Sequence, residues 1–288
     1  MGGRQGGKLR PEVTAAGTGS DSARRSGRIW YQSFTDPAVD AAYFSRLDAY
    51  LQSVSGSGFE IAVAGIRPGD RHLHPITEFR CAAQVIANAL GAERAGYDAF
   101  VIGHFQEPGL AEARAAVGIP VIGLGEAAML YALTLGRRVG LVTINPAFIP
   151  YHQDQIARYG LQQRVVAVTA LAADVGQLNR AFGDEQEYAR LRQAFTAQAR
   201  AMLESGVDVI IPAGGYPMLL FAHEDGFTID GATALNGLPV TVAAAETAIR
   251  LRRLNGTSTS RRASYALPPS EAVAEFGRAF SSADPASC

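Results

Sequence analysis

Short apolar runs rich in β-branched residues alternate with longer stretches of helical periodicity along the central part of this chain. The apolar runs predict β-strands at 28–32, 59–64, 98–103, 119–123, 138–144, 164–169, 207–212 and 238–242. The helical periodicity predicts helices at 38–53, 77–94, 109–117, 125–135, 150–159, 184–205 and 243–253. Continuous apolar strands separated by helices are typical of parallel sheets that are covered on both faces. The pattern therefore predicts an α/β fold with parallel sheets flanked by helices.

The sequence also partly repeats itself after a shift of 110 residues. The repeat pairs strand 28–32 with 138–142, segment 96–104 with 206–214 and, after a gap of nine residues, 119–121 with 238–240. Any two βαβ units resemble each other to some extent, but a constant offset at two separate strands favours duplication. We therefore expect two similar lobes related by a pseudo-twofold axis, with the active site in the cleft between them.

The division of the chain follows from this repeat and from local composition. Residues 1–26 are rich in Gly, Arg and Ser and nearly lack large apolar residues, which predicts a disordered tail. We expect residues 27–125 together with 238–254 to form the first α/β lobe and 126–237 to form the second. Residues 255–288 are predicted to be a flexible segment that contains a short helix at about 269–281.

Composition excludes several classes of partner. The hydrophobic fraction of 48% is enough for a full core, and the net charge of −1 gives no reason to expect nucleic acid. No apolar run approaches the length of a membrane helix, so no membrane partner is expected. The two cysteines, Cys81 and Cys288, do not support a disulfide framework, and no signal peptide is expected because no apolar run follows the basic residues near the N-terminus. These features predict a cytoplasmic protein, and we leave open that it forms a homo-oligomer.

Polar and small residues follow four of the predicted strands. Ligands of open parallel sheets bind beyond the carboxyl ends of the strands, so these residues are expected to meet in one cleft. They are Gln32 and Ser33, His104 to Gln106, Thr143 to Asn145, and Ala213 to Tyr216.

Segment 98–129 carries a resemblance to a known family. Its first part reads DAFVIGHFQEPGL, and a PVIG stretch and a GEAAM stretch follow. This resembles the Asp-Ala-x-x-Ile-x-Cys-Phe-x-Asp-Pro-Gly-Leu motif of hydantoin-racemase-like proteins in the aspartate/glutamate/hydantoin racemase superfamily. The likeness extends over roughly 28–253, and VDVIIPAGGYPMLL resembles the family's second strand, which ends in Gly-Cys.

The resemblance implies racemisation by two cysteines, one from each lobe, which act as base and acid on opposite faces of an α-carbon. In this sequence His104 stands at the first cysteine position. Gly214 stands at the second by strand counting, or Ala213 if Tyr216-Pro217 is taken as the anchor. We therefore expect a divergent member that lacks both catalytic cysteines. The superfamily also contains arylmalonate decarboxylase and maleate isomerase, which act on carboxylates.

An imidazole titrates near neutral pH, so His104 is predicted to be the general acid/base in place of the racemase cysteine, although a structural histidine would fit the same position. Tyr216 is a second catalytic candidate, with ordinary aromatic packing as the alternative. The backbone amides of Gly214 and Gly215 are predicted to bind a carboxylate or enolate oxygen. The remaining substrate-binding candidates are Gln32, Ser33, Phe105, Thr143 and Asn145. We expect Glu107, which replaces the Asp of the motif, to be structural.

No cofactor and no metal are expected, because the chain has neither a phosphate-binding glycine motif nor a standard Cys/His zinc spacing around His72 and His74. The predicted function is that of a cofactor-independent isomerase or lyase. It would transfer a proton from one side, next to the carboxylate or carbonyl of a small carboxylate or cyclic amide. Two alternatives remain open: a hydrolase or cyclase in which His104 activates water, and an inactive protein that binds a metabolite.

Overall fold

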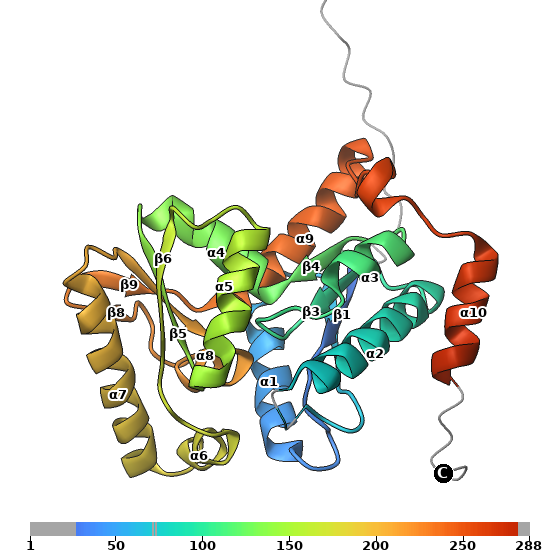
Figure 1. Cartoon of the computed structure of the whole chain (residues 1–288). Coiled ribbons are helices and arrows are strands. Elements are labelled where there is room, and N and C mark those ends of the chain that lie inside the picture. The colour runs from blue at the N-terminus through green and yellow to red at the C-terminus, as the bar shows by residue number, and fades with distance from the viewer. Residues whose placement is uncertain (1–26, 71, 73, 282–288) are drawn as a thin grey trace, which may run out of the picture.

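The computed structural model describes residues 27–281 except 71 and 73, so the predicted N-terminal tail lies outside the described residues. The first of two sheets is fully parallel and has the strand order β2-β1-β3-β4. Its strands are β1 (Gly27–Gln32), β2 (Phe59–Ala64), β3 (Ala99–Ile102) and β4 (Val121–Gly123). Figure 1 shows this sheet on the right, beside the second sheet on the left.

Helices cover both faces of the first sheet, because consecutive side chains of a strand point to opposite sides. Ala99 and Val101 of β3 belong to a core that includes buried residues of α1 (Ala41–Val54) and α9 (Gly237–Asn255). Phe100 and Ile102 belong to the core that includes buried residues of α2 (Pro75–Arg94) and α3 (Leu110–Ala116). Both faces of the first sheet are therefore covered, as the continuous apolar strands predict.

The second sheet has the order β6-β5-β7-β9-β8 and is parallel except for its last pair. Its strands are β5 (Val139–Thr143), β6 (Val165–Ala170), β7 (Val209–Ala213), β8 (Thr228–Ile229) and β9 (Ala232–Ala234). The antiparallel β8–β9 hairpin at the edge was not predicted. The helices of this part are α4 (Leu124–Leu135), α5 (Ile149–Arg158), α6 (Val175–Ala181), α7 (Glu185–Leu203) and α8 (Gly215–Leu220).

The predicted strand at 238–242 is wrong, because these residues form the first turns of α9. The Asn236 side chain accepts a hydrogen bond from the amide of Leu238 and so begins the helix. Pro239 is tolerated there, because the first four amides of a helix have no intrahelical partner. Helix α9 then packs against β1, β3 and β4 and also against α4 and α8.

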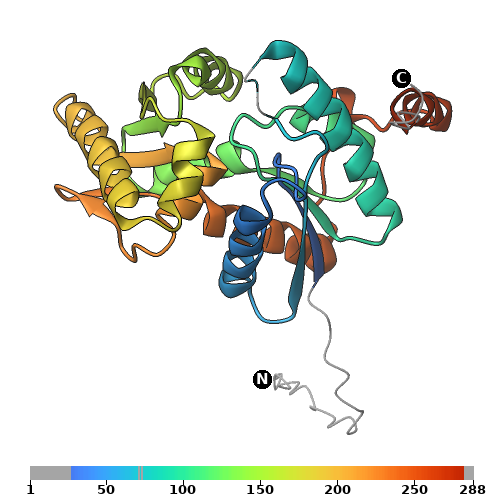
Figure 2. The same cartoon turned by 90° about the horizontal axis from the view of Figure 1, so that it is seen from below.

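The predicted C-terminal helix is present as α10 (Ser270–Ser281), which contacts α2. The segment before it was expected to be flexible, but Arg261 donates hydrogen bonds to the carbonyls of Arg114 and Val117 at the end of α3. Figure 2 shows α10 at the outer end of the first lobe and α7 at the outer end of the second.

The internal repeat is present in the hydrogen-bonding register. Ile29 of β1 pairs with Ala99 of β3, and Val139 of β5 pairs with Val209 of β7, which preserves the offset of 110 residues. In both lobes an aspartate makes the same hydrogen bond at the beginning of this strand pair. The Asp98 carboxylate accepts from the amide of Arg28 at 2.8 Å, and the Asp208 carboxylate accepts from the amide of Arg138 at 3.0 Å.

The third match of the repeat needs correction, because β9 rather than 238–240 occupies the position equivalent to β4. Val121 of β4 pairs with Phe100, and Ala234 of β9 pairs with Ile210. The prediction of an α/β fold with two lobes built on mainly parallel sheets is confirmed. Within the described residues, no helix is long and apolar enough to cross a membrane.

Candidate active site

The carboxyl ends of strands from both sheets open onto one cavity of about 610 Å³ between the lobes. The first wall of this cavity comes from the first lobe and includes Ser33, Phe34, Asp70, Gly103 and His104. The second wall comes from the second lobe and includes Ile144, Asn145, Ala213, Gly214, Gly215 and Tyr216. The predicted convergence of strand ends is therefore observed, as expected for parallel sheets.

His104 lies immediately after β3 on the first wall, where two aromatic rings fix its position. Its imidazole stacks on Phe34 with ring centroids 4.4 Å apart, and the Phe148 ring lies nearly perpendicular to it with ring centroids 6.4 Å apart. The preceding Gly103 is required by close packing, since a Cβ atom there would lie 2.2 Å from the Tyr31 ring. The chain can therefore reach the cavity beside Tyr31 only without a side chain at position 103, and His104 is the first side chain that enters it.

Two acidic residues that the sequence did not predict lie against His104. Glu78 Oε1 is 3.6 Å from His104 Nε2, and the ligand atoms of Asp70, Glu78 and His104 all lie within 4.8 Å of one another. Burial works against ionisation of Glu78, but the facing His104 and Asp70 hold its pKa below the ordinary value. Burial and the neighbouring Glu78 raise the pKa of Asp70. The imidazole thus has a buried carboxylate directly behind it.

These residues escaped prediction because they are not at the ends of strands. Asp70 lies in the loop that follows β2, and a search of whole loops at the carboxyl edge would have included it. Glu78 lies in the first turn of α2, where nothing in the helical periodicity indicates that it faces His104.

On the second wall, the equivalent strand end carries no side chain that could act as an acid or a base. Ala213, Gly214 and Gly215 place no functional side chain opposite the first lobe, and the Gly214 amide donates to the Pro212 carbonyl at 2.9 Å. The Gly215 amide begins α8 on the same wall. Its Cα is close to the first lobe, since a Cβ atom at Gly215 would lie 3.3 Å from the Gly103 carbonyl oxygen.

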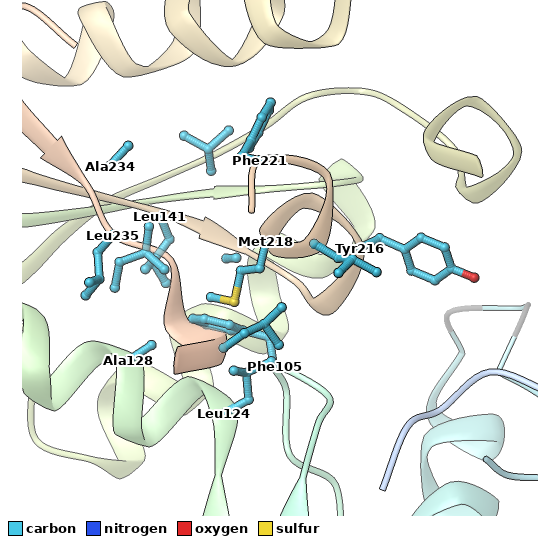
Figure 3. Close-up of a cluster of buried hydrophobic side chains, with 14 of the residues drawn as sticks. Phe105, Leu124, Ala128, Leu141, Tyr216, Met218, Phe221, Ala234 and Leu235 are labelled. Atoms are coloured by element: carbon cyan, nitrogen blue, oxygen red, sulfur yellow. The ribbon is translucent and has the colours of Figure 1, made fainter. Parts of the chain in front are cut away.

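Tyr216 crosses from the second lobe to the first. Its ring stacks on Tyr43 of α1, with centroids 4.0 Å apart and an angle of 21° between the planes. Figure 3 shows its ring pointing away from the apolar cluster of the second lobe. Ser33 and Asn145 also line the cavity. The Ser33 hydroxyl lies 3.0 Å from that of Thr35, and Asn145 caps a short 3-10 turn by accepting from the Ala147 amide.

Three of the predicted substrate contacts, Gln32, Phe105 and Thr143, have fully buried side chains that do not line the cavity. Gln32 donates to the carbonyls of Ser33 and Gly65 and accepts from Asn88. It therefore fastens the end of β1 to its neighbours.

Phe105 and Thr143 both pack against His152. Phe105 presents its ring to the His152 edge and lies within the apolar cluster of Figure 3. The Thr143 hydroxyl lies 3.0 Å from His152 Nε2. Burial lowers the pKa of His152 to about 4, so this histidine is a neutral structural residue near neutral pH.

Glu107 is fully enclosed and holds the start of α4. Its carboxylate accepts from the amide of Glu126 and from the Gln155 side chain, each at 2.8 Å, and from the hydroxyl of Tyr159. Burial raises the pKa of Glu107 to about 7. These contacts agree with the predicted structural role.

Cys81 lies in α2 and is fully buried. Burial raises the pKa of its thiol to about 12, which leaves it protonated near neutral pH. Cys288 lies outside the described residues.

The two-lobed fold with a cavity at the strand ends defines the class to which this chain belongs. Residues 35–245 match the sequence model of the Asp/Glu/hydantoin racemase family, and the chain belongs to that family. It is 30% identical over 248 residues to a hydantoin racemase from Pseudomonas sp. (strain NS671), with 84% of this chain and 95% of the relative covered.

Solved structures agree with this assignment. Allantoin racemase from Klebsiella pneumoniae superposes with a TM-score of 0.68 and 26% identity, covering 84% of this chain and 94% of that one. Allantoin racemase from Pseudomonas fluorescens superposes with a TM-score of 0.69 and 24% identity, covering 84% and 97%.

Proposed function

We propose that this protein is an isomerase of the racemase superfamily that moves a proton on a carbon next to a carbonyl group. The named relatives act on hydantoin and allantoin, which supports a cyclic amide or ureide as the substrate class. The proton transfer needs no cofactor. One observation carries the proposal: a histidine with a carboxylate behind it faces a wall whose equivalent strand end is Ala213 and Gly214.

His104 is the proposed general base. When the Nε2–H of a neutral imidazole points at the Glu78 carboxylate, the lone pair is on Nδ1, and that nitrogen is the one able to accept a proton. Glu78 also stabilises the imidazolium that forms when the proton is taken up, as an acidic partner does in other histidine-based sites. Glu78 is therefore a proposed positioning residue.

The substrate carbonyl gains negative charge as the proton leaves carbon. The backbone N–H of Gly215 is the proposed donor to that oxygen, since preorganised amides stabilise such charge effectively. The Gly214 amide, also predicted for this role, is already bonded to Pro212. Ser33 and Asn145 are the proposed side-chain contacts to the rest of the substrate, and Tyr216 closes the cavity by packing on Tyr43.

The chain lacks catalytic cysteines under this proposal, and a base on one wall alone returns the proton to the face from which it came. Isomerisation in which the proton returns on the same side to a different atom of the enolate, or cleavage of a neighbouring bond followed by protonation from one face, is then favoured over racemisation.

Hydrogen exchange in deuterated water tests this function. A single enantiomer of allantoin or of a 5-substituted hydantoin is incubated with the enzyme, and NMR follows deuterium incorporation while circular dichroism follows optical purity. The uncatalysed rates are subtracted. We expect deuterium incorporation that outpaces loss of optical purity. Equal rates of the two processes would show that a second base acts from the opposite wall.

A further inference from the structure

Asp70, Glu78 and His104 bring two carboxylates and one imidazole to a single point beside the cavity. They belong to three separate segments: the loop after β2, the first turn of α2 and the residue after β3. Their ligand atoms lie within 4.8 Å of one another. We call this group the acidic–histidine cluster.

Each member of the acidic–histidine cluster has a buried atom without a hydrogen bond. These atoms are Asp70 Oδ2, Glu78 Oε1 and His104 Nε2, and Glu78 as a whole is only 8% exposed. Buried polar atoms are nearly always paired, because an unpaired one loses its hydration without compensation. His104 Nε2 and Glu78 Oε1 face each other at 3.6 Å, which is beyond hydrogen-bond distance, so the three atoms indicate a shared partner.

The charges around the cluster indicate that the partner is a cation. Two carboxylates face one imidazole, which supplies at most one positive charge. The nearby Arg80 does not make up the difference, since its guanidinium donates to the carbonyls of Pro68 and Gly69 and to Gln84 and Cys81. A divalent ion would balance the charge.

The donor set decides which ion fits. Imidazole nitrogen together with carboxylate oxygen suits Zn²⁺ and similar transition ions, whereas Mg²⁺ and Ca²⁺ prefer oxygen alone. Donor atoms around tetrahedral Zn²⁺ lie about 3.3–3.6 Å apart. The observed 3.6 Å between Glu78 Oε1 and His104 Nε2 agrees with that spacing, whereas ligand atoms of the cluster up to 4.8 Å apart would have to move closer when the ion binds.

Two hydrogen bonds hold the loop that carries Asp70 in place. The amide of Asp70 donates to the Phe34 carbonyl at 3.0 Å, and Arg80 holds the Pro68 carbonyl at 2.7 Å. Asp70 and His104 line the cavity while Glu78 lies behind them, so a bound ion would have one side toward the cavity.

We propose that Asp70, Glu78 and His104 bind one divalent transition ion of the Zn²⁺ type. The sequence predicted no metal, because two of the three ligands are carboxylates from segments with no zinc-binding spacing. The inference goes beyond the proposed function. When Nε2 of His104 binds the ion, its proton is on Nδ1, so His104 cannot act as a base. His104 therefore either binds the ion or takes up a proton, but not both at once.

Direct titration with Zn²⁺ tests the site without any substrate. The full chain, freed of any affinity tag and dialysed against a chelator, is titrated by calorimetry with Zn²⁺ and separately with Mg²⁺. We expect one Zn²⁺ per chain and much weaker binding of Mg²⁺. Co²⁺ in place of Zn²⁺ should show visible absorption bands that require His104.

Variants separate this site from chance binding. Glu78→Gln and Asp70→Asn should each weaken Zn²⁺ binding by roughly tenfold or more, since each loses a charged ligand. The matched control is His72→Gln with His74→Asn, which removes two nearby histidines and keeps a side-chain acceptor at the start of α2. Circular dichroism checks that each variant folds, and Asp70→Asn at the cavity surface serves if Glu78→Gln does not.

The proposal is overturned if Zn²⁺ binds equally well to the wild type and to the folded Asp70 or Glu78 variants, or if only the control variant loses binding. Because the readout is binding, a failed metal site would leave the proposed proton transfer intact, and a failed exchange assay would leave the metal site intact.

Discussion

At equivalent positions beyond the third strand of each lobe, the first lobe has Gly103 and His104 where the second has Ala213 and Gly214. The backbone register of the two lobes is the same, yet at this equivalent position the first wall carries the imidazole of His104 and the second carries only the hydrogen atom of Gly214. Around His104 the first lobe also adds Asp70 and Glu78. The comparison shows that a repeated fold can keep its topology while its two walls take up different chemistry.

The largest effect expected from breaking this asymmetry is the loss of His104. His104→Ala should reduce turnover by roughly 10²–10⁴-fold, the usual contribution of a general acid–base group. Substrate affinity should change much less, because the proposed contacts of the substrate are Gly215, Ser33 and Asn145. Steady-state kinetics separates the two quantities.

The matched control for that variant is His223→Ala, a histidine outside the cavity of about 610 Å³. It should keep wild-type turnover. Unchanged turnover in His104→Ala would show that the base lies elsewhere.

The second comparison concerns the glycines of the two strand ends. Gly103→Ala would place Cβ 2.2 Å from the Tyr31 ring, while Gly214→Ala would place it 3.1 Å from Pro217. Overpacking of a buried site costs about 1–3 kcal/mol, so Gly103→Ala should lose about that much stability and Gly214→Ala less than about 1 kcal/mol. Chemical denaturation measures both, and equal losses would contradict the packing difference between the lobes.

A third difference is the buried carboxyl of Glu107, since the residue 110 positions later is Pro217. Burial raises the pKa of Glu107 from 4.5 to about 7, so the folded protein holds a proton that the unfolded chain releases between these values. This contribution to stability is complete below pH 4.5 and is lost as the pH rises through about 7.

Glu107→Gln removes that dependence. The stability advantage of the wild type over the variant should shrink by roughly 2–3 kcal/mol between pH 4.5 and 7. Denaturation at several pH values measures it. His152 titrates in the same range, but it is present in both proteins and cancels in the difference. A constant advantage across this range would show that the Glu107 pKa is not raised.

The smallest effect is expected at Cys81. Cys81→Ser should leave turnover within about twofold of the wild type, because the thiol is buried in α2 and does not line the cavity. A kinetic assay beside a denaturation curve separates chemistry from stability. A large loss of turnover with intact stability would point to a thiol mechanism.

Much of the fold could be predicted from the sequence, because apolar runs and helical periodicity are local signals of burial. The existence of strands β1 to β7 and the placement of His104 beyond β3 follow from such signals and from the repeat, whereas the order of the strands in each sheet was not predicted. The segment 238–242 was mispredicted because a Pro-Val run reads as a strand, whereas Asn236 caps a helix there.

What the sequence alone determined is therefore the two-lobed α/β framework and the residues at its strand ends. The tertiary structure decided which of those side chains reach the cavity. Gln32 makes hydrogen bonds within the first lobe and Thr143 within the second, while Ser33 and His104 face the cavity. It also brought Asp70 and Glu78 to His104. Their proximity depends on how a loop and a helix pack across the sheet, and no local sequence pattern predicts such a contact.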